Sequence, residues 1–446
     1  MAAGLLALGL LLGRSLAVRI AGKVHPWPCK NGNLMRTGQG HFSGSGPHDL
    51  TSATWVFDHD ASDHDPSNAF YQSPVIDSDR NTYFSSTNGK YYSVAPGGEV
   101  NWEVQLRKEQ RKAGQMPTPV LRDDALYTVD GQGCAVALSL ASGKELWRAK
   151  YAHRTGDDSW SMGLDTKTGT LYAVGFPTEQ DGKKCQYGGT HLYALDSRDG
   201  STKWSYKLKG CTCNVMPSVV DNTLLFSDVT GIVYALDAAT GAERWIAPGN
   251  DPNTFTTGTA AVGEDGQIFV ASNVRRGRGV MRAYDLRSGA KHWERAFDHE
   301  ANNAPAVYRD RRGRLLVAMG VSDNAEFPLP WLEGKVSYEG TVYALDAATG
   351  DTAWTFQPPV WKHPACAGST FQRMCLPDAF TNPSVDASGT IYIGWMGGVA
   401  YGINGTTGKK VSSWQTGSGM QGAPGIADGM LVVSSCQRMA GFVRQP

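Results

Sequence analysis

Charge of either sign is scarce in this sequence, and neither sign is in excess. The 446 residues contain 42 Lys and Arg and 42 Asp and Glu, so the formal net charge is zero. A nucleic-acid binder neutralises phosphates with a basic excess, which this composition does not provide. Charged residues make up 19% of the chain, against about 25% in average soluble domains. The hydrophobic fraction of 41% is ample for a packed core and excludes a disordered chain.

Long hydrophobic runs are also absent. The run Ala2–Leu12 has 11 residues, whereas a membrane-spanning helix needs about 20, and no later segment is long and apolar enough. Arg14 and then Ser15-Leu16-Ala17 follow the run, and the small residues predict a cleaved secretory signal over residues 1–17. We therefore expect no transmembrane segment and a protein that is secreted or kept in a secretory-pathway lumen or periplasm. An amphipathic mitochondrial presequence is the alternative.

Cysteine motifs for metal and haem are missing. The sequence contains no CxxC and no CxxCH, which argues against a zinc site and against covalent haem. The eight cysteines are an even number, as an oxidising compartment favours. Cys366 and Cys375 lie nine residues apart in one predicted loop and are the disulfide candidates. Cys185, Cys211 and Cys213 form a second region in which a pair is expected.

Glycine and tryptophan are plentiful, with 53 and 13 residues, and both follow an internal repeat. The sequence Tyr-Ala-Leu-Asp ends at Asp196, and Gly200 and Trp204 follow at intervals of four. The same spacing recurs in complete or degenerate copies along the chain. Eight of the 13 tryptophans fall into this register: Trp55, Trp102, Trp147, Trp204, Trp245, Trp293, Trp354 and Trp414.

Each copy predicts two antiparallel strands joined by a tight turn, because the Asp bonds its own backbone and the Gly supplies a positive φ. A second strand pair lies upstream, for example over 74–84. Four short strands per repeat are typical of a propeller blade. Ser52–His59 supplies one strand and Gly422–Val443 about three, so both ends are predicted to complete one blade. We predict an all-β, eight-bladed β-propeller of four-stranded antiparallel blades over residues 52–446, after a lead segment over 18–51; seven blades is the alternative.

The repeat resembles the pyrroloquinoline-quinone (PQQ) repeat family, whose consensus reads Tyr-Ala-Leu-Asp-x-x-Thr-Gly-x-x-x-Trp. The resemblance implies that each Trp docks near a turn glycine of the next blade, such as Trp204 near Gly241. The in-register tryptophans are therefore predicted to hold blades together rather than to bind a ligand. The family includes quinoprotein dehydrogenases that hold PQQ and calcium, and non-catalytic propellers such as the bacterial outer-membrane assembly lipoprotein. This chain lacks the adjacent Cys-Cys pair of the dehydrogenases and a lipobox Cys after the signal.

One face of the predicted propeller carries all the long connections. If the strands of a blade are labelled A to D from the channel outwards, the D-to-A and B-to-C connections share one face. The A-to-B and C-to-D turns share the other face and are short. Segments 320–339 and 355–382 are among the long connections. Because long ordered loops usually carry function, we predict that the loop-rich face binds and that the opposite face is plain.

Several residues on the loop-rich face are candidates for binding. The candidates for a polar ligand are five amides near the starts of inner strands, Gln72, Asn214, Asn303, Asn382 and Gln421, together with Trp160. The candidates for a metal share one acidic loop: Asp58, Asp60, Asp63 and Asp65. A solvated acidic loop is the alternative for these carboxylates. Trp331, Trp361 and Trp395 lie outside the repeat register, as Trp160 does, and are partner candidates. Asn404, in an Asn-Gly-Thr sequon, is the glycosylation candidate.

Two functions from different classes fit the sequence. The first is a secreted, non-catalytic propeller that binds a protein or glycan through the loop-rich face, since no complete catalytic set is present. The second is a PQQ- and calcium-dependent dehydrogenase of alcohols or sugars, which the family resemblance implies. We expect a monomer with no nucleic-acid partner. Whether the protein is an enzyme stays open at this point.

Overall fold

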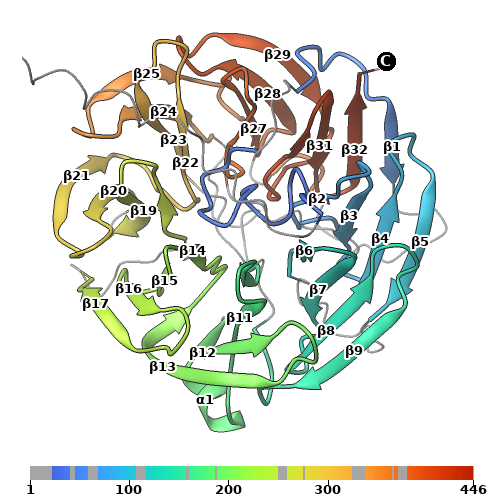
Figure 1. The fold of residues 1–446 in the computed structure, drawn as a ribbon. Coiled ribbons are helices and arrows are strands. Elements are labelled where there is room, and N and C mark those ends of the chain that lie inside the picture. The colour runs from blue at the N-terminus through green and yellow to red at the C-terminus, as the bar shows by residue number, and fades with distance from the viewer. Residues whose placement is uncertain are drawn as a thin grey trace, which may run out of the picture.

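The computed structural model is a closed ring of eight four-stranded antiparallel sheets, which confirms the predicted eight-bladed β-propeller (Figure 1). The structure describes residues 23–40, 46–58, 69–106, 117–156, 160–185, 188–249, 259–274, 277–323, 337–363, 366–369 and 379–444. Inner strands of successive blades contact one another around the central channel, as β10 contacts β14 and β30 contacts β2. Within the described ranges, no helix is long and apolar enough to cross a membrane.

The first four blades follow one another along the chain. Blade 1 comprises β2 (Val75–Ile76), β3 (Thr82–Ser85), β4 (Lys90–Val94) and β5 (Val100–Gln105). Blade 2 comprises β6 (Val120–Arg122), β7 (Ala125–Val129), β8 (Cys134–Ser139) and β9 (Glu145–Lys150). Blade 3 comprises β10 (Gly163–Asp165), β11 (Thr170–Gly175), β12 (Gly189–Asp196) and β13 (Thr202–Thr212), with α1 (Glu179–Lys184) between β11 and β12. Blade 4 comprises β14 (Ser218–Val220), β15 (Thr223–Ser227), β16 (Val233–Asp237) and β17 (Glu243–Ala247).

The other four blades complete the circle. Blade 5 comprises β18 (Ala261–Val262), β19 (Gln267–Val274), β20 (Arg278–Asp285) and β21 (Lys291–Phe297). Blade 6 comprises β22 (Ala306–Arg309), β23 (Leu315–Ser322), β24 (Gly340–Asp346) and β25 (Thr352–Phe356). Blade 7 comprises β26 (Ser384–Val385), β27 (Thr390–Trp395), β28 (Val399–Asn404) and β29 (Lys410–Gln415). Blade 8 comprises β30 (Gly425–Ala427), β31 (Met430–Ser434), β32 (Arg438–Val443) and β1 (Trp55–Asp58).

Blade 8 joins the two ends of the chain, as the sequence predicts. Its outermost strand β1 pairs with β32, so that Trp55 lies opposite Gly441 and Asp58 opposite Arg438. The Thr54 amide adds a hydrogen bond of 2.7 Å to the Gly441 carbonyl. This pairing covers the edge of β32 and ties the two ends of the chain into one blade.

The turn that joins strands C and D has the predicted chemistry. In blade 4, the Asp237 side chain accepts hydrogen bonds from the amides of Ala239 and Thr240, at 3.1 and 3.0 Å. Gly241 closes the turn with φ +75° and donates its amide to the Asp237 carbonyl at 2.8 Å. An L-residue with a side chain adopts that φ only at a cost, so glycine recurs at this position.

Seven of the eight in-register tryptophans pack against a turn glycine of the next blade, as the resemblance implies. A Cβ added to the glycine would lie 2.5–2.7 Å from the indole or Cβ atoms in these pairs: Gly98 and Trp55, Gly143 and Trp102, Gly200 and Trp147, Gly241 and Trp204, Gly289 and Trp245, Gly350 and Trp293, Gly408 and Trp354. Trp414 differs because blade 8 has no C-to-D turn, and it packs edge-on against Phe442 with ring centroids 5.3 Å apart.

The two faces differ in their connections as predicted. No A-to-B or C-to-D turn is longer than five residues, whereas the D-to-A and B-to-C connections include 357–383 and 323–339. A disulfide between Cys185 and Cys211 joins the connection that holds α1 to the end of β13 on the loop-rich face. This pair lies in the second predicted region, and Cys436 is disulfide-bonded as well. Cys375, of the other predicted pair, lies outside the described residues.

Candidate functional site

A segment of the lead region lines the channel on the inside of the ring. Residues 27–38, which we call the collar, run past the inner strands near their A-to-B ends, at the face with short turns (Figure 1, dark blue). The collar carbonyls accept hydrogen bonds of 2.6–2.9 Å from one inner-strand amide in each of six blades: Ile76, Leu121, Val219, Val262, Val307 and Val385. Inner strands leave unpaired backbone amides at the channel, and the collar satisfies them.

Arg36 fixes the collar with a buried guanidinium. Its side chain is fully buried and donates to the carbonyls of Lys30 at 2.7 Å, Met162 at 2.6 Å and Pro217 at 3.2 Å. These acceptors belong to the collar and to the entries of blades 3 and 4. Burial lowers the pKa of Arg36, and burial raises the pKa of the neighbouring Cys29 thiol. The guanidinium thus connects three parts of the channel wall without a carboxylate among its bonds.

His25 precedes the collar and is held as a neutral imidazole. Its Nδ1 accepts from the Ser78 amide at 3.1 Å, so Nε2 carries the proton that is donated to the Asp123 carbonyl at 2.9 Å. Burial lowers the pKa of His25 from its ordinary value of 6.5. The contacts join the start of the described chain to the A-to-B turns of blades 1 and 2.

At the loop-rich end of the channel, hydrogen bonds join the entries of neighbouring inner strands. The Ala423 amide donates to Ser73 Oγ at 2.8 Å, and the Ser73 amide donates to Thr118 Oγ1 at 3.3 Å. The Thr118 amide in turn donates to the Trp160 carbonyl at 2.9 Å. On the other side of the ring, the Ala304 amide donates to Asn382 Oδ1 at 2.9 Å. These bonds hold blades 8, 1, 2 and 3, and blades 6 and 7, in register.

Two of the predicted ligand-binding residues belong to this set of bonds. Gln72 Oε1 accepts from Thr118 Oγ1 at 3.2 Å, and Asn382 Nδ2 donates to Asn31 Oδ1 of the collar at 3.0 Å. Both side chains are at least nine-tenths buried. The structure therefore gives them a role in joining the blades and the collar.

The other predicted ligand-binding residues carry polar atoms without a partner. Within the described part of the chain, Trp160 Nε1, Asn214 Oδ1, Asn303 Oδ1 and Gln421 Oε1 are buried and make no hydrogen bond. They enter blades 3, 4, 6 and 8, so the ring distributes them around the channel instead of gathering them on one side. Buried polar atoms without protein partners are commonly satisfied by ordered water or by a ligand.

The remaining candidates have different surroundings. Asp58 ends β1 and accepts from Arg438 Nε at 2.9 Å, while Asp60, Asp63 and Asp65 lie outside the described residues. Trp395 is buried in the blade 7 core, and Trp331 lies outside the described residues. The Asn404 side chain accepts from the amides of Thr406 and Thr407, as the Asp of other copies does.

Trp361 lies on the loop-rich face and is half-buried. Its backbone pairs with Tyr338 through hydrogen bonds of 2.9 and 3.0 Å, which join the long connections of blades 6 and 7. The adjacent Val360 is exposed to 42%. The Tyr338–Trp361 pairing therefore holds the loop that carries the exposed Val360 side chain.

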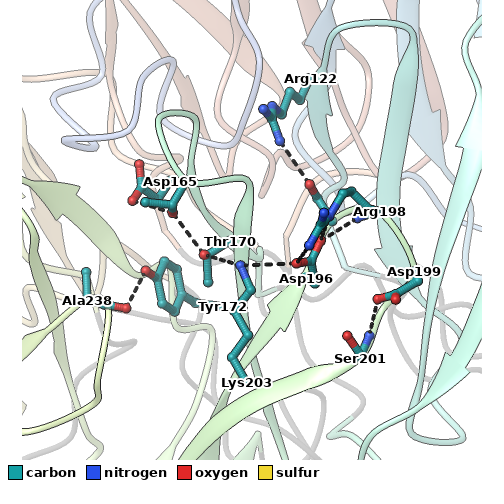
Figure 2. A network of polar contacts seen from close by, with 12 residues as sticks. Arg122, Asp165, Thr170, Tyr172, Asp196, Arg198, Asp199, Ser201, Lys203 and Ala238 are labelled. Carbon is teal, nitrogen blue, oxygen red and sulfur yellow. Dashed lines mark hydrogen bonds and ion pairs between the residues drawn. The ribbon is translucent and has the colours of Figure 1, made fainter.

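On the face with short turns, a polar network joins blades 2, 3 and 4 (Figure 2). Asp196 accepts from Arg198 Nε at 2.9 Å and from Nη2 at 2.7 Å, and the Arg198 bonds hold the pKa of Asp196 well below its usual range. Arg122 Nη1 donates to Ser197 Oγ at 2.9 Å. The Tyr172 hydroxyl donates to the Ala238 carbonyl at 2.9 Å. The Arg122 bond thus joins the C-to-D turn of blade 3 to blade 2, and the Tyr172 bond joins the C-to-D turn of blade 4 to β11 of blade 3.

The fold and the channel define a class of protein, the eight-bladed propeller of PQQ-type repeats, here with a collar in its channel. The comparisons with known proteins make the class more specific. The chain belongs to the family described as outer membrane protein assembly factor BamB, whose profile matches residues 63–175, 87–249, 149–323, 229–367 and 338–443.

The individual relatives include both assembly factors and dehydrogenases. An outer membrane protein assembly factor BamB of Shewanella oneidensis is 25% identical over 260 residues, 58% of this chain and 60% of that protein. A polyvinylalcohol dehydrogenase of Sphingopyxis sp. is 26% identical over 435 residues, 79% of this chain and 64% of that protein. The chain thus spans less than two thirds of the length of both relatives. The quinohemoprotein alcohol dehydrogenase structure from Comamonas testosteroni shares the fold, with a TM-score of 0.65, 14% identity, and coverage of 96% of this chain and 82% of that one.

Sequence reasoning missed the collar and the threonines of the ring. Arg36, Asn31 and Cys29 of the collar lie in a segment with no repeat spacing, although a buried Trp27 and two turn glycines mark it as ordered. Thr118 and Thr259 occupy the same place before an inner strand as the predicted amides do. Alignment of the eight strand entries would have found these threonines.

Proposed function

We propose that the protein is a non-catalytic binding propeller that engages a protein or glycan partner through its loop-rich face, in a secretory or periplasmic compartment. The membership in the BamB family supports this proposal. The fixed, partly exposed Trp361 and Val360 support it too, because half-buried aromatic residues beside apolar groups are frequent anchors of interfaces.

The observation that carries the proposal is the scarcity of charge among the described residues directly before the inner strands. The described residues immediately before the eight inner strands are largely uncharged: 69–74, 117–119, 160–162, 213–217, 259–260, 301–305, 379–383 and 416–424 contain no Asp, Glu, Lys, Arg or His, although Asp298, His299 and Glu300 directly precede 301–305. PQQ is a quinone with several carboxylates, and calcium takes six to eight oxygen ligands that usually include carboxylates. Glu300 lines a small cavity with Asn302 and Asn303, but in the described residues this carboxylate and its neighbouring amides fall short of the ligand set that PQQ and calcium need.

The second candidate function, a PQQ- and calcium-dependent dehydrogenase of alcohols or sugars, is favoured by a different observation. Trp160 Nε1, Asn214 Oδ1 and Asn303 Oδ1 are buried around the channel without a partner in the described ranges. A small polar ligand would satisfy such atoms. The similarity to the polyvinylalcohol dehydrogenase also supports this candidate.

Addition of PQQ and calcium to the purified protein separates the two functions. We expect no saturable change in PQQ absorbance or in tryptophan fluorescence, and no dye-linked oxidation across a panel of alcohols and aldoses. Saturable binding with dye reduction would contradict the proposal and establish the dehydrogenase.

Partner capture tests the loop-rich face directly. The immobilised protein is presented to a glycan array and to a secretory or periplasmic protein fraction, next to a variant in which short Gly-Ser linkers replace residues 324–336 and 370–378. Because the linkers leave the Tyr338–Trp361 pairing in place, we expect loss of capture without loss of the circular dichroism spectrum.

Two valines with similar exposure provide a matched control. Val360→Ser, on the loop-rich face, is expected to weaken capture, whereas Val411→Ser, on the outer strand β29, is expected to leave it unchanged; the side chains are exposed to 42% and 45%. Equal capture by both variants and by the loop-replaced protein would refute the proposed face.

A further inference from the structure

The face with short turns is hollowed around the collar. Three cavities, of about 450, 450 and 320 Å³, open there along the interfaces of blades 3 and 4, 4 and 5, and 5 and 6, respectively. Met35 of the collar lines all three, so the cavities meet at its side chain. We call them together the collar groove. The prediction that this face is plain holds for its turn lengths but not for its shape.

The floor of the collar groove is apolar and fixed. It is formed by Met35 and Leu34 of the collar and by Val220, Val262 and Val307 of three inner strands. The Met35 carbonyl accepts from the Val262 amide at 2.9 Å, and the Met35 amide donates to Asn33 Oδ1 at 3.1 Å. Met35 is only half-buried, so an incoming apolar side chain would gain contact with it.

The rim of the collar groove has an excess of negative charge. The three linings contain five carboxylates, Asp165, Asp221, Glu264, Asp265 and Asp285, and three cations, Lys167, Arg287 and Arg309. Glu264 forms an ion pair with Arg309, which leaves four carboxylates to two cations. Asp221 is exposed at the boundary of two cavities.

We infer that the collar groove binds an extended peptide segment in which apolar side chains alternate with basic ones. The apolar side chains pack on Met35 and the inner-strand valines, and the basic side chains pair with the acidic rim, chiefly at Asp221. An extended segment fits because the groove follows three successive blade interfaces instead of forming one deep pocket. This site lies on the face opposite the loops and does not depend on the proposed function.

Fluorescence anisotropy with three labelled pentapeptides tests the charge requirement. The probes are Val-Arg-Val-Arg-Val, Val-Glu-Val-Glu-Val and Val-Ser-Val-Ser-Val, each added to the full-length protein at low salt. We expect saturable binding of the basic peptide, at least fivefold tighter than that of the other two, and weakening on addition of 0.5 M salt, an ionic strength at which surface pairs are screened. Tighter binding of the acidic or the uncharged peptide, or no saturation with any of the three, would overturn the inference.

Two substitutions test the location of the site. Asp221→Asn removes one rim charge, and asparagine tolerates the positive φ of 44° at this position. Asp428→Asn is the matched control, since Asp428 also occupies a two-residue A-to-B turn but lies in blade 8, away from the groove. We expect a two- to fivefold loss of affinity for the basic peptide with Asp221→Asn, a larger loss with Met35→Ala, and no change with the control. Equal affinity in all three folded variants would exclude the collar groove as the site.

Discussion

The packing of tryptophan on turn glycine predicts a large difference between two Gly→Ala substitutions in blade 6. Gly350 and Gly313 have nearly the same backbone, with φ of 77° and 79°. A Cβ on Gly350 would lie 2.7 Å from the Trp293 ring, whereas a Cβ on Gly313 would meet no heavy atom within 4 Å. Both substitutions carry the cost of a left-handed conformation, about 1–2 kcal/mol. Gly350→Ala adds an overpacking cost of about 1–3 kcal/mol, because real Cβ contacts are never this short.

Urea unfolding followed by far-UV circular dichroism measures both costs. We expect Gly313→Ala to lower the free energy of unfolding by about 1–2 kcal/mol and Gly350→Ala to lower it by about 2–5 kcal/mol. In a Trp293→Ala background the ring is absent, so Gly350→Ala is expected to cost no more than Gly313→Ala does. The difference between the cost of Gly350→Ala in the wild type and its cost in the Trp293→Ala background is the coupling energy between Gly350 and Trp293. Equal costs of the two alanines in the wild-type background would refute the reasoning.

Three further predictions concern Arg36 of the collar, His25 and the disulfide. Arg36→Met is expected to lower the free energy of unfolding by about 3 kcal/mol or more, because three buried carbonyls each lose a donor worth about 1 kcal/mol or more; urea unfolding measures this, and an unchanged midpoint would contradict it. The folded-state pKa of His25 lies below its unfolded value of 6.5, so the unfolded chain binds more protons and stability is expected to fall as the pH drops below about 6.5. Thermal midpoints at pH 7.5 and 5.5 should therefore differ more in the wild type than in His25→Gln, and an equal difference would count against the buried neutral imidazole. Cys185→Ser opens a disulfide that spans 26 residues, for which chain entropy predicts a loss of about 3–4 kcal/mol that disappears when both proteins are compared in reductant.

The repeat made most of the ring predictable from sequence. The turn Asp, the turn Gly and the following Trp act within or between adjacent copies, so each copy repeats the same local information. Gly241 and Trp204 illustrate this, since their contact needs only the correct order of blades. Closure of the ring could be predicted because the one strand near the N-terminus complements the three strands near the C-terminus in a single blade.

The collar could not be predicted because its partners are spread over the chain. Its carbonyls bond strands from Ile76 to Val385, and no spacing within residues 27–38 encodes such contacts. For the same reason the roles of Gln72 and Asn382 in joining inner strands needed the structure, although their place before those strands was predicted. The collar groove also escaped prediction, because loop length does not report the concavity formed by short turns around a central segment.

The collar makes a segment near the start of the described residues dependent on the last blades. The Gly38 carbonyl accepts a hydrogen bond from the Val385 amide, so this part of the collar has no binding partner until blade 7 has formed. Strand β1 likewise has no pairing partner until β32 has formed. A chain synthesised from its N-terminus keeps these segments without partners until nearly all of it has emerged. Seating of the collar and closure of the ring thus belong to one late folding step, in which the amides of Val219, Val262, Val307 and Val385 would gain protection from hydrogen exchange together.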